Sequence, residues 1–185
     1  MNFATRMSRL GTETAFEVLA KAKALEAQGR HMIHLEIGEP DFDTPKNIGF
    51  AAMQALMRGE THYNPSPGIP PLRQAIAEDI AKRRGINAKP EEVVVTPGAK
   101  PIMFFVLLAL AEKGDEVIYP NPGFPIYESV INFSGATAVP IPLKEEFEFR
   151  FDLDDLRKLV NDRTKLIIVN SPQNPTGGVL TKEDL

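Results

Sequence analysis

Residues 116–141 read EVIYPNPGFPIYESVINFSGATAVPI and contain a strand, a helix and a second strand in that order. The apolar run at 116–119 predicts the first strand, 125–133 the helix and 136–141 the second strand. A helix between two strands is typical of parallel pairing, because parallel strands need a crossover of about a dozen residues or more, whereas antiparallel strands can be joined by a short turn. This stretch therefore predicts an α/β fold.

The same alternation continues on either side of this stretch. The β-branched run at 93–95 and the Ile- and Val-rich run at 165–170 predict two further strands. Helices are expected at 101–112 and 152–160. Strands that alternate with helices are typical of a mostly parallel sheet with helices on both faces.

The first half of the chain is predicted to be mainly helical. Thr14 and Glu17 have the spacing of a capping box and begin a helix that ends before Gly29. The other elements expected here are a short strand at 32–37, a helix at 44–59 and a helix that carries Leu72, Ala75, Ile76 and Ile80. At the other end, Thr181 and Asp184 predict the first turn of another helix, so we expect the chain to be a truncated piece of a longer protein.

The composition excludes several classes of protein and site. The 185 residues are 43% hydrophobic and 25% charged, with a net charge of -4 and no clustered basic stripe, so no nucleic-acid partner is expected. The absence of cysteine excludes disulfides and thiolate metal sites. The longest apolar run, 102–111, is too short to span a bilayer, and no signal peptide is apparent. We expect a cytoplasmic protein without a membrane partner, and no metal site, because His31, His34 and His62 lack metal-ligand spacing.

Ligands of open α/β sheets bind beyond the carboxyl ends of the strands, so the turns there are the candidate sites. In the turn at 96–101, TPGAKP, Gly98 permits a tight reversal and leaves backbone N–H groups at the start of a helix, where a phosphate is the natural guest. An ordinary strand-to-helix turn is the alternative. In the turn at 170–178, NSPQNPTGG, the amide of Asn174 can bind a ring hydroxyl, although the composition equally suits a surface turn.

Two aromatic residues and one further loop are also candidates. Phe124, in the turn that follows the strand at 116–119, can stack on a planar ring, but core packing is the commoner fate of a phenylalanine. Tyr63, in the proline-rich loop at 62–68, can hydrogen-bond a phosphate or pack half-buried. The loop at 37–42 also looks ordered.

Four segments taken together resemble one protein family. They are Gly38-Glu39-Pro40-Asp41-Phe42, the Tyr63 loop with Gly68 and Leu72-Arg73, the Gly98 turn, and Asn174-Pro175-Thr176-Gly177. In this order they resemble the class I/II aminotransferases, which are fold type I enzymes dependent on pyridoxal 5'-phosphate (PLP). The resemblance covers 11–185 and implies an N-terminal arm with part of a small domain at 1–43. It places at 44–185 the incomplete first part of a large PLP-binding domain, the large-domain type of PLP-dependent transferases.

The resemblance implies a role for each cofactor-binding residue. The N–H groups of Ala99 and Lys100, after Gly98, would hold the cofactor phosphate. Phe124 would stack on the pyridine ring. Asn174 would hydrogen-bond the 3-hydroxyl oxygen of the cofactor and lie close to the substrate.

The resemblance also implies a homodimer and an activity. Tyr63 would reach the cofactor phosphate of the neighbouring subunit, and the backbone at Gly38 would lie near the substrate carboxylate. The lysine that binds PLP covalently is expected beyond Leu185, so no catalytic residue is assigned and the chain alone is expected to be inactive. The implied reaction of the intact enzyme moves an amino group between an amino acid and a 2-keto acid. The alternatives are a β-eliminating carbon–sulfur lyase on the same scaffold and a non-catalytic binding module, and the substrate pair stays open.

Overall fold

The computed structural model describes residues 2–11 and 14–185. The chain forms two compact units, one made of Met1–Val18 with Gly98–Leu185 and the other of Leu19–Pro97. We call the first the sheet unit and the second the helical unit. The predicted domain boundary between residues 43 and 44 stays a prediction.

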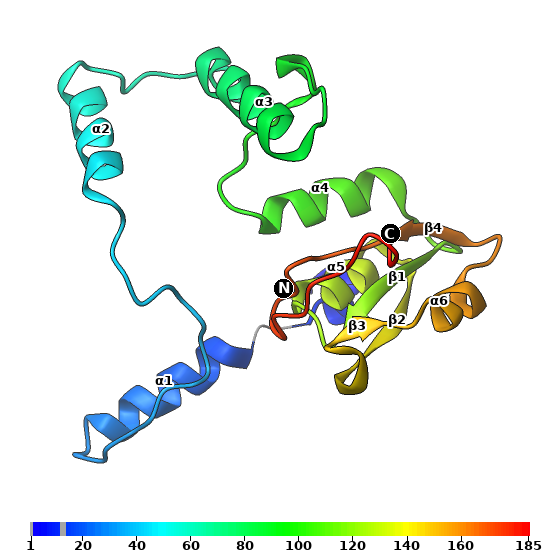
Figure 1. The fold of residues 1–185 in the computed structure, drawn as a ribbon. Helices are drawn as coiled ribbons and strands as arrows, with labels where there is room; N and C mark the ends of the chain where they lie inside the picture. Colours follow the sequence, from blue (N-terminus) through cyan, green and yellow to red (C-terminus); the bar gives the residue numbers. More distant parts are fainter. Residues whose placement is uncertain (1, 12–13) are drawn as a thin grey trace. The chain divides into compact units, whose positions relative to one another are not determined.

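The sheet unit contains a four-stranded mixed sheet of order β3-β2-β1-β4 (Figure 1). Both β2 and β4 are parallel to β1, and the short β3 is antiparallel to β2. Its helices and strands are α4 (Lys100–Leu110), β1 (Glu116–Asn121), α5 (Ile126–Ser134), β2 (Thr137–Lys144), β3 (Arg150–Phe151), α6 (Leu153–Leu159) and β4 (Thr164–Ile167), with 3-10 turns η1 (Thr5–Arg9) and η3 (Glu145–Phe147). The predicted α/β fold with a mostly parallel sheet is confirmed.

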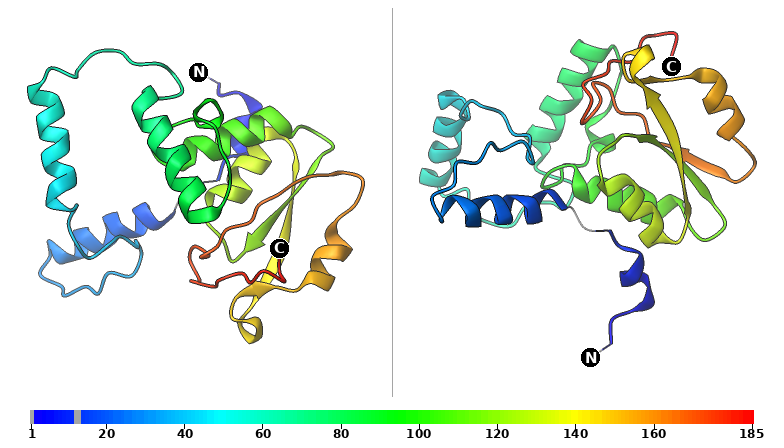
Figure 2. Two further views of the ribbon diagram at one scale, coloured as in Figure 1. Left: turned by 45° about the horizontal axis from the view of Figure 1, so that its top comes forward. Right: turned by 90° about the horizontal axis from the view of Figure 1, so that it is seen from below.

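Helices cover both faces of the sheet, as the alternating pattern predicts. Val117 of β1 packs with Leu107 of α4 and with Val130 and Ile131 of α5, and each of the four is at most 1% exposed. Ile118 points to the opposite face and packs against the side of α6. Burial of each of these side chains stabilises the fold by about 1.5–3 kcal/mol, so the two clusters hold the layers together. Figure 2 shows α5 and α6 on opposite sides of the strands.

Polar contacts fasten the two parallel strands at their beginning. The buried Glu116 opens β1, and its carboxylate accepts hydrogen bonds from Asn161 Nδ2 and Arg163 Nε, each at 2.8 Å. Asn161 first, and then the Arg163 guanidinium, holds the pKa of Glu116 below its ordinary value. The loop before β4 is thereby tied to the first residue of β1.

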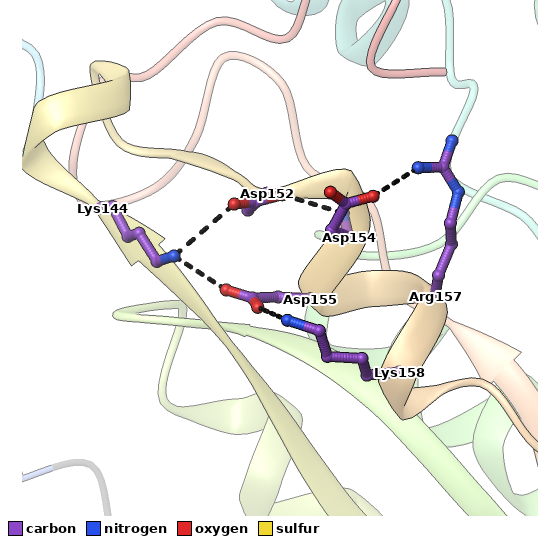
Figure 3. A network of polar contacts seen from close by, with 6 residues as sticks. All are labelled: Lys144, Asp152, Asp154, Asp155, Arg157 and Lys158. Atoms are coloured by element: carbon purple, nitrogen blue, oxygen red, sulfur yellow. Dashed lines mark hydrogen bonds and ion pairs between the residues drawn. The ribbon is translucent and has the colours of Figure 1, made fainter.

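A second polar network fixes the start of α6 (Figure 3). Asp152 caps the helix, because its Oδ1 accepts a hydrogen bond of 2.8 Å from the backbone N–H of Asp154. Lys144 Nζ, at the end of β2, lies 2.8 Å from Asp155 and 3.7 Å from Asp152. Hydrogen bonds from Lys144 first, and then from Lys158, hold the pKa of Asp155 below its usual value. The network joins α6 to the neighbouring strand.

The helical unit contains most of α1 (Thr14–Glu26), with α2 (Lys46–Met57), α3 (Pro70–Arg84) and the 3-10 turn η2 (Pro90–Glu92). A proline stands in the first turn of α3, and Gly85 ends the helix with a φ of 69°. Arg73 Nε donates a hydrogen bond of 2.8 Å to the carbonyl of Val93 and fastens α3 to the segment that follows η2.

Three predicted elements are wrong. Residues 93–95 form no strand, and the N–H of Val95 donates instead to the carbonyl of Pro67 at 2.9 Å. Residues 32–37 also form no strand. In both cases the β-branched or alternating pattern is present, but no ladder partner lies beside it among the described residues, and strand formation depends on that partner. At the end of the chain the Asp184 carboxylate accepts a hydrogen bond of 2.7 Å from the N–H of Thr181, so the cap forms around a turn and not around a helix.

Candidate cofactor site

The candidate site lies where the parallel strands end. Because β1 and β4 run in the same direction, their carboxyl ends meet at one edge of the sheet. The N–H of Ile168 donates to the carbonyl of Ile118 at 2.8 Å and continues the pairing one residue beyond β4. Beyond this edge the turn at 122–125 leads into α5, and the loop at 168–178 follows β4.

The Gly98 turn presents the beginning of α4 to solvent. Gly98 has a φ of 87°, a conformation that side chains disfavour, and a methyl group built on it would have no neighbour within 4 Å. Gly98, Ala99 and Lys100 are all exposed, and the carbonyl of Ala99 accepts the first bonds of α4 from Ile102 and Met103. The helix dipole makes this end favourable for an anion, which fits a phosphate group.

The Lys100 side chain connects this turn with Phe124. Its Nζ lies 5.9 Å from the centroid of the Phe124 ring and 5.8 Å from that of Phe16, so the ammonium stands close to two aromatic rings. The Phe124 ring packs edge-on against Tyr127 at a centroid distance of 5.9 Å. The partly buried Phe124 therefore has a fixed orientation beside a positive charge.

Close backbone packing requires glycine at position 123, in the turn that carries Phe124. A Cβ built on Gly123 would lie 2.1 Å from the carbonyl oxygen of Pro120, far inside contact distance. The turn can be this tight only because residue 123 has no side chain.

Gln173 joins the loop of Asn174 to the turn of Phe124. The side chain of Gln173 is buried, and its Nε2 donates 3.1 Å hydrogen bonds to the carbonyls of Pro122 and Asn174. Its backbone also pairs with the loop, donating to Gly178 and accepting from Gly177 at 2.8 Å. The sequence alone predicts no role for Gln173. The only sequence signal was an amide beside Asn174 at a strand end, which equally suits a surface turn.

Two buried tyrosines lie beneath this edge and were likewise unassigned. Burial first, and then the charge of Glu128, raises the pKa of Tyr119 to about 12. Burial also raises the pKa of Tyr127, although the hydrogen bond from Asn170 opposes the shift. Both hydroxyls are therefore neutral near pH 7. The hydroxyl of the buried Tyr127 also contacts Asn170, in the loop after β4.

A cavity of about 520 Å³ lies beside Lys100, between α4, α5 and the N-terminal segment. Its polar lining includes Arg9, Glu128 and Ser129, and Arg9 Nε is fixed by a 2.9 Å hydrogen bond to the carbonyl of Asn132. Gly98, Phe124 and Asn174 do not line it.

The predicted site residues thus fall into two groups. In the sheet unit, the Gly98–Lys100 turn and Phe124 are neighbours through Lys100, and the loop of the exposed Asn174 is bonded to the turn of Phe124 through Gln173. In the helical unit, the Tyr63 side chain is fully exposed and Gly38 lies in an exposed loop. The roles assigned to these residues stay predictions.

The donor set of the sheet unit fits a phosphorylated planar ring. It combines the solvent-exposed amino end of a helix, an ammonium group, an aromatic face and a carboxamide. Among residues 2–11 and 14–185, no group of three or more His, Asp or Glu side chains could hold a metal ion. Within the same part of the chain, no helix is both long and apolar enough to cross a membrane.

Comparison with known proteins identifies the family. Residues 30–185 match the model of the family described as aminotransferase class I and II. The chain is 45% identical over 182 residues to a probable aspartate/prephenate aminotransferase of Aquifex aeolicus, covering 98% of the chain and 46% of that relative. An aspartate aminotransferase of Bacillus sp. (strain YM-2) is 39% identical over 182 residues, again 98% of the chain and 46% of the relative.

Solved structures agree with this match. The Thermus thermophilus aspartate aminotransferase with maleate superposes with a TM-score of 0.95 at 38% identity, over 100% of the chain and 48% of that structure. An alanine aminotransferase from Pyrococcus furiosus gives a TM-score of 0.93 at 34% identity, over 98% and 47%. The chain spans about half the length of the curated relatives that it matches. With its family model matched from residue 30 onward, this chain belongs to the class I and II aminotransferase family.

Proposed function

We propose that the whole protein transfers an amino group from an amino acid to a 2-keto acid, with PLP as cofactor. The observation that carries the proposal is the position of Lys100. Its ammonium group stands at the amino end of α4 and 5.9 Å from the Phe124 ring, so an anion and a planar ring can be held together. PLP, when bound, takes up the electrons released at the α-carbon of the amino acid.

The residues of this chain would bind and orient the cofactor and the substrate. The N–H groups of Ala99 and Lys100 hold the phosphate, and Gly98 lets the backbone approach it. Phe124 stacks against the ring, and Asn174 donates a hydrogen bond to its 3-oxygen. Gln173 keeps the Asn174 loop against the Phe124 turn.

The partners and the location belong to the same proposal. Tyr63 reaches the cofactor phosphate of a second subunit in a cytoplasmic homodimer, and Gly38 and Asn174 contact the substrate. Two of the relatives described above are named for aspartate, which makes aspartate the first amino donor to test. We assign no catalytic lysine among these 185 residues and expect the chain alone to give no turnover.

The experiment uses the full-length protein supplied with PLP, aspartate and 2-oxoglutarate. Transamination requires equal amounts of a new keto acid and a new amino acid, measured by chromatography, with no net release of ammonia. A cysteine thioether as the sole substrate tests the alternative, because β-elimination releases ammonia without an acceptor. Ammonia release without amino transfer overturns the proposal in favour of a lyase, and PLP binding without either product favours a binding module.

Single substitutions test whether the named residues hold the cofactor. Phe124→Leu and Asn174→Ala are expected to raise the Kd for PLP, measured by titrating the apoprotein and following cofactor absorbance. Phe147→Leu is the matched control, because this aromatic residue lies in η3 and contacts Lys144. An equal Kd in all three variants would remove Phe124 and Asn174 from the site.

A further inference from the structure

His34 is held between two carboxylates in the helical unit. Its Nδ1 lies 2.6 Å from Glu36 Oε1, and its Nε2 lies 2.8 Å from Glu26 Oε1. Glu26 is the last residue of α1, and Glu36 stands two residues before Gly38. The imidazole therefore connects the end of a helix with the segment that leads into the Gly38 loop.

The geometry requires a charged imidazole. A neutral ring carries one N–H and can donate to only one carboxylate, which leaves the other carboxylate facing a lone pair. An imidazolium donates from both nitrogens and satisfies both contacts. A cation at this position is also favoured by the dipole at the carboxyl end of α1.

The contacts continue from Glu36 into the backbone. The Glu36 carboxylate also accepts hydrogen bonds from the N–H groups of Glu36 and Leu35, and its side chain is only 9% exposed. The His34 and Glu26 side chains are 36% and 43% exposed, so solvent protons reach the group freely. Loss of the imidazolium charge would weaken the contacts that hold the chain at 34–36.

We propose that His34, Glu26 and Glu36 form a pH-dependent clasp that positions the Gly38 loop at the end of α1. The charged groups that face the ring are Glu26 from α1 and Glu36 from the segment of His34 itself. His34 is a positioning residue, since it acts on the substrate only through the loop. The link to substrate binding rests on the proposed function, in which Gly38 contacts the substrate carboxylate.

The pH range of the clasp follows from the direction of each shift. The hydrogen bond to Glu36 first, and then that to Glu26, raises the pKa of His34 above 6.5, so the contact is fully present below pH 6.5 and is lost as the pH rises through the higher folded value. The bond from His34 lowers the pKa of Glu36 below 4.5, so its contribution is present above pH 4.5 and is lost as the pH falls through the lower folded value. The clasp is closed between these limits and opens on either side of them, by loss of the imidazolium charge at high pH and of the Glu36 charge at low pH.

The first test measures the clasp itself. NMR titration of the ring protons of the 185-residue chain is expected to give a His34 pKa above 6.5, which falls in Glu26→Gln and again in Glu36→Gln. The amide of Glu36 should lose exchange protection several-fold between pH 6 and pH 9, after correction for the intrinsic exchange rate. The protection in His34→Gln should not vary with pH. A His34 pKa at or below 6.5, or equal protection at both pH values, overturns the clasp.

The second test measures its consequence in the full-length protein with PLP. His34→Gln is expected to raise KM for the amino acid several-fold while kcat stays within about twofold, because the loop affects binding of substrate and transition state alike. The wild-type KM should rise with pH in the range where His34 titrates. His31→Gln is the matched control, since no side-chain partner of His31 is found among the described residues.

The two tests separate the possible failures. If amino transfer is absent from the wild type, the proposed function fails while the NMR result still decides the clasp. If transfer occurs and the clasp titrates, but His34→Gln leaves KM unchanged, the positioning role of His34 is overturned.

Discussion

Replacement of Gly123 by alanine tests the turn that carries Phe124. The added Cβ would lie 2.1 Å from the carbonyl oxygen of Pro120 and 3.5 Å from Cδ2 of Tyr127, whereas ordinary contact begins at 3.4 Å. The obstacle is backbone, so no side-chain rotation relieves it, and the turn must open by roughly 1 Å. Overpacking of this kind costs about 1–3 kcal/mol. Alanine also restricts the unfolded chain, which returns about 0.4–1 kcal/mol.

The 2.1 Å approach puts the cost at the upper end of that range, so the expected net result is a loss of about 2 kcal/mol in the free energy of unfolding of the sheet unit. Urea denaturation followed by tyrosine fluorescence measures it, in a Tyr63→Phe background. The chain has three tyrosines, and the two that remain, Tyr119 and Tyr127, are both buried in the sheet unit. The signal then reports on that unit alone.

Gly11→Ala is the matched control in the same unit. Its Cβ would meet only Ser129, at 3.5 Å, and its φ lies outside the left-handed region. We expect this variant to be neutral or stabilised by up to about 1 kcal/mol. Equal free energies for Gly123→Ala and Gly11→Ala would refute the argument that the turn depends on the missing side chain.

Three further substitutions test the core, the strand pairing and the loop connection. Leu107→Ala should lower the free energy of unfolding by about 2–5 kcal/mol in the same denaturation assay, because Leu107 is 1% exposed in the main cluster. The pKa of Glu116 is lowered in the folded chain, so the stability of the wild type should fall as the pH drops below 4.5 and Glu116 becomes protonated. Glu116→Gln should reduce that pH dependence, which is measured by comparing thermal melting at pH 7 and pH 3. Gln173→Leu should raise the Kd of the full-length protein for PLP more than Ser171→Ala does, because only Gln173 bonds to the Phe124 turn; an equal Kd would refute that role.

The sequence correctly predicts strands and helices whose hydrogen-bonding and packing partners lie nearby in the chain. The β1–α5–β2 unit forms close to its predicted limits, because each strand is short and apolar and the helix between them ends at a glycine. The run at 93–95 has an even stronger β-branched character and yet forms no strand. Its N–H groups depend on a partner strand, which residue composition cannot supply, and Val94 stays exposed beside the loop at 67.

In the candidate site too, local sequence patterns indicate some residues, whereas the contacts between distant segments cannot be predicted from them. Gly98, Phe124 and Asn174 could be proposed because turn chemistry and strand ends are visible in sequence. The bond from Gln173 to Pro122 joins residues 51 positions apart, and no local pattern indicates it. The position of Lys100 beside Phe124 is equally a product of packing between α4 and α5.

Only a few contacts fix the turns beyond the carboxyl ends of the strands. The apolar clusters fix the strands, and Phe124 packs against one of them, but neither cluster includes the Gly98 turn or Asn174. Beyond that edge, order depends on the Gln173 amide and on the close packing of Gly123 against Pro120. A single buried amide contributes about 1 kcal/mol, which is small against the burial energy of the core but enough to shift the position of a loop that few other contacts hold. Changes at Gln173 should therefore alter cofactor affinity well before they alter the stability of the sheet, whereas changes at Leu107 should do the reverse.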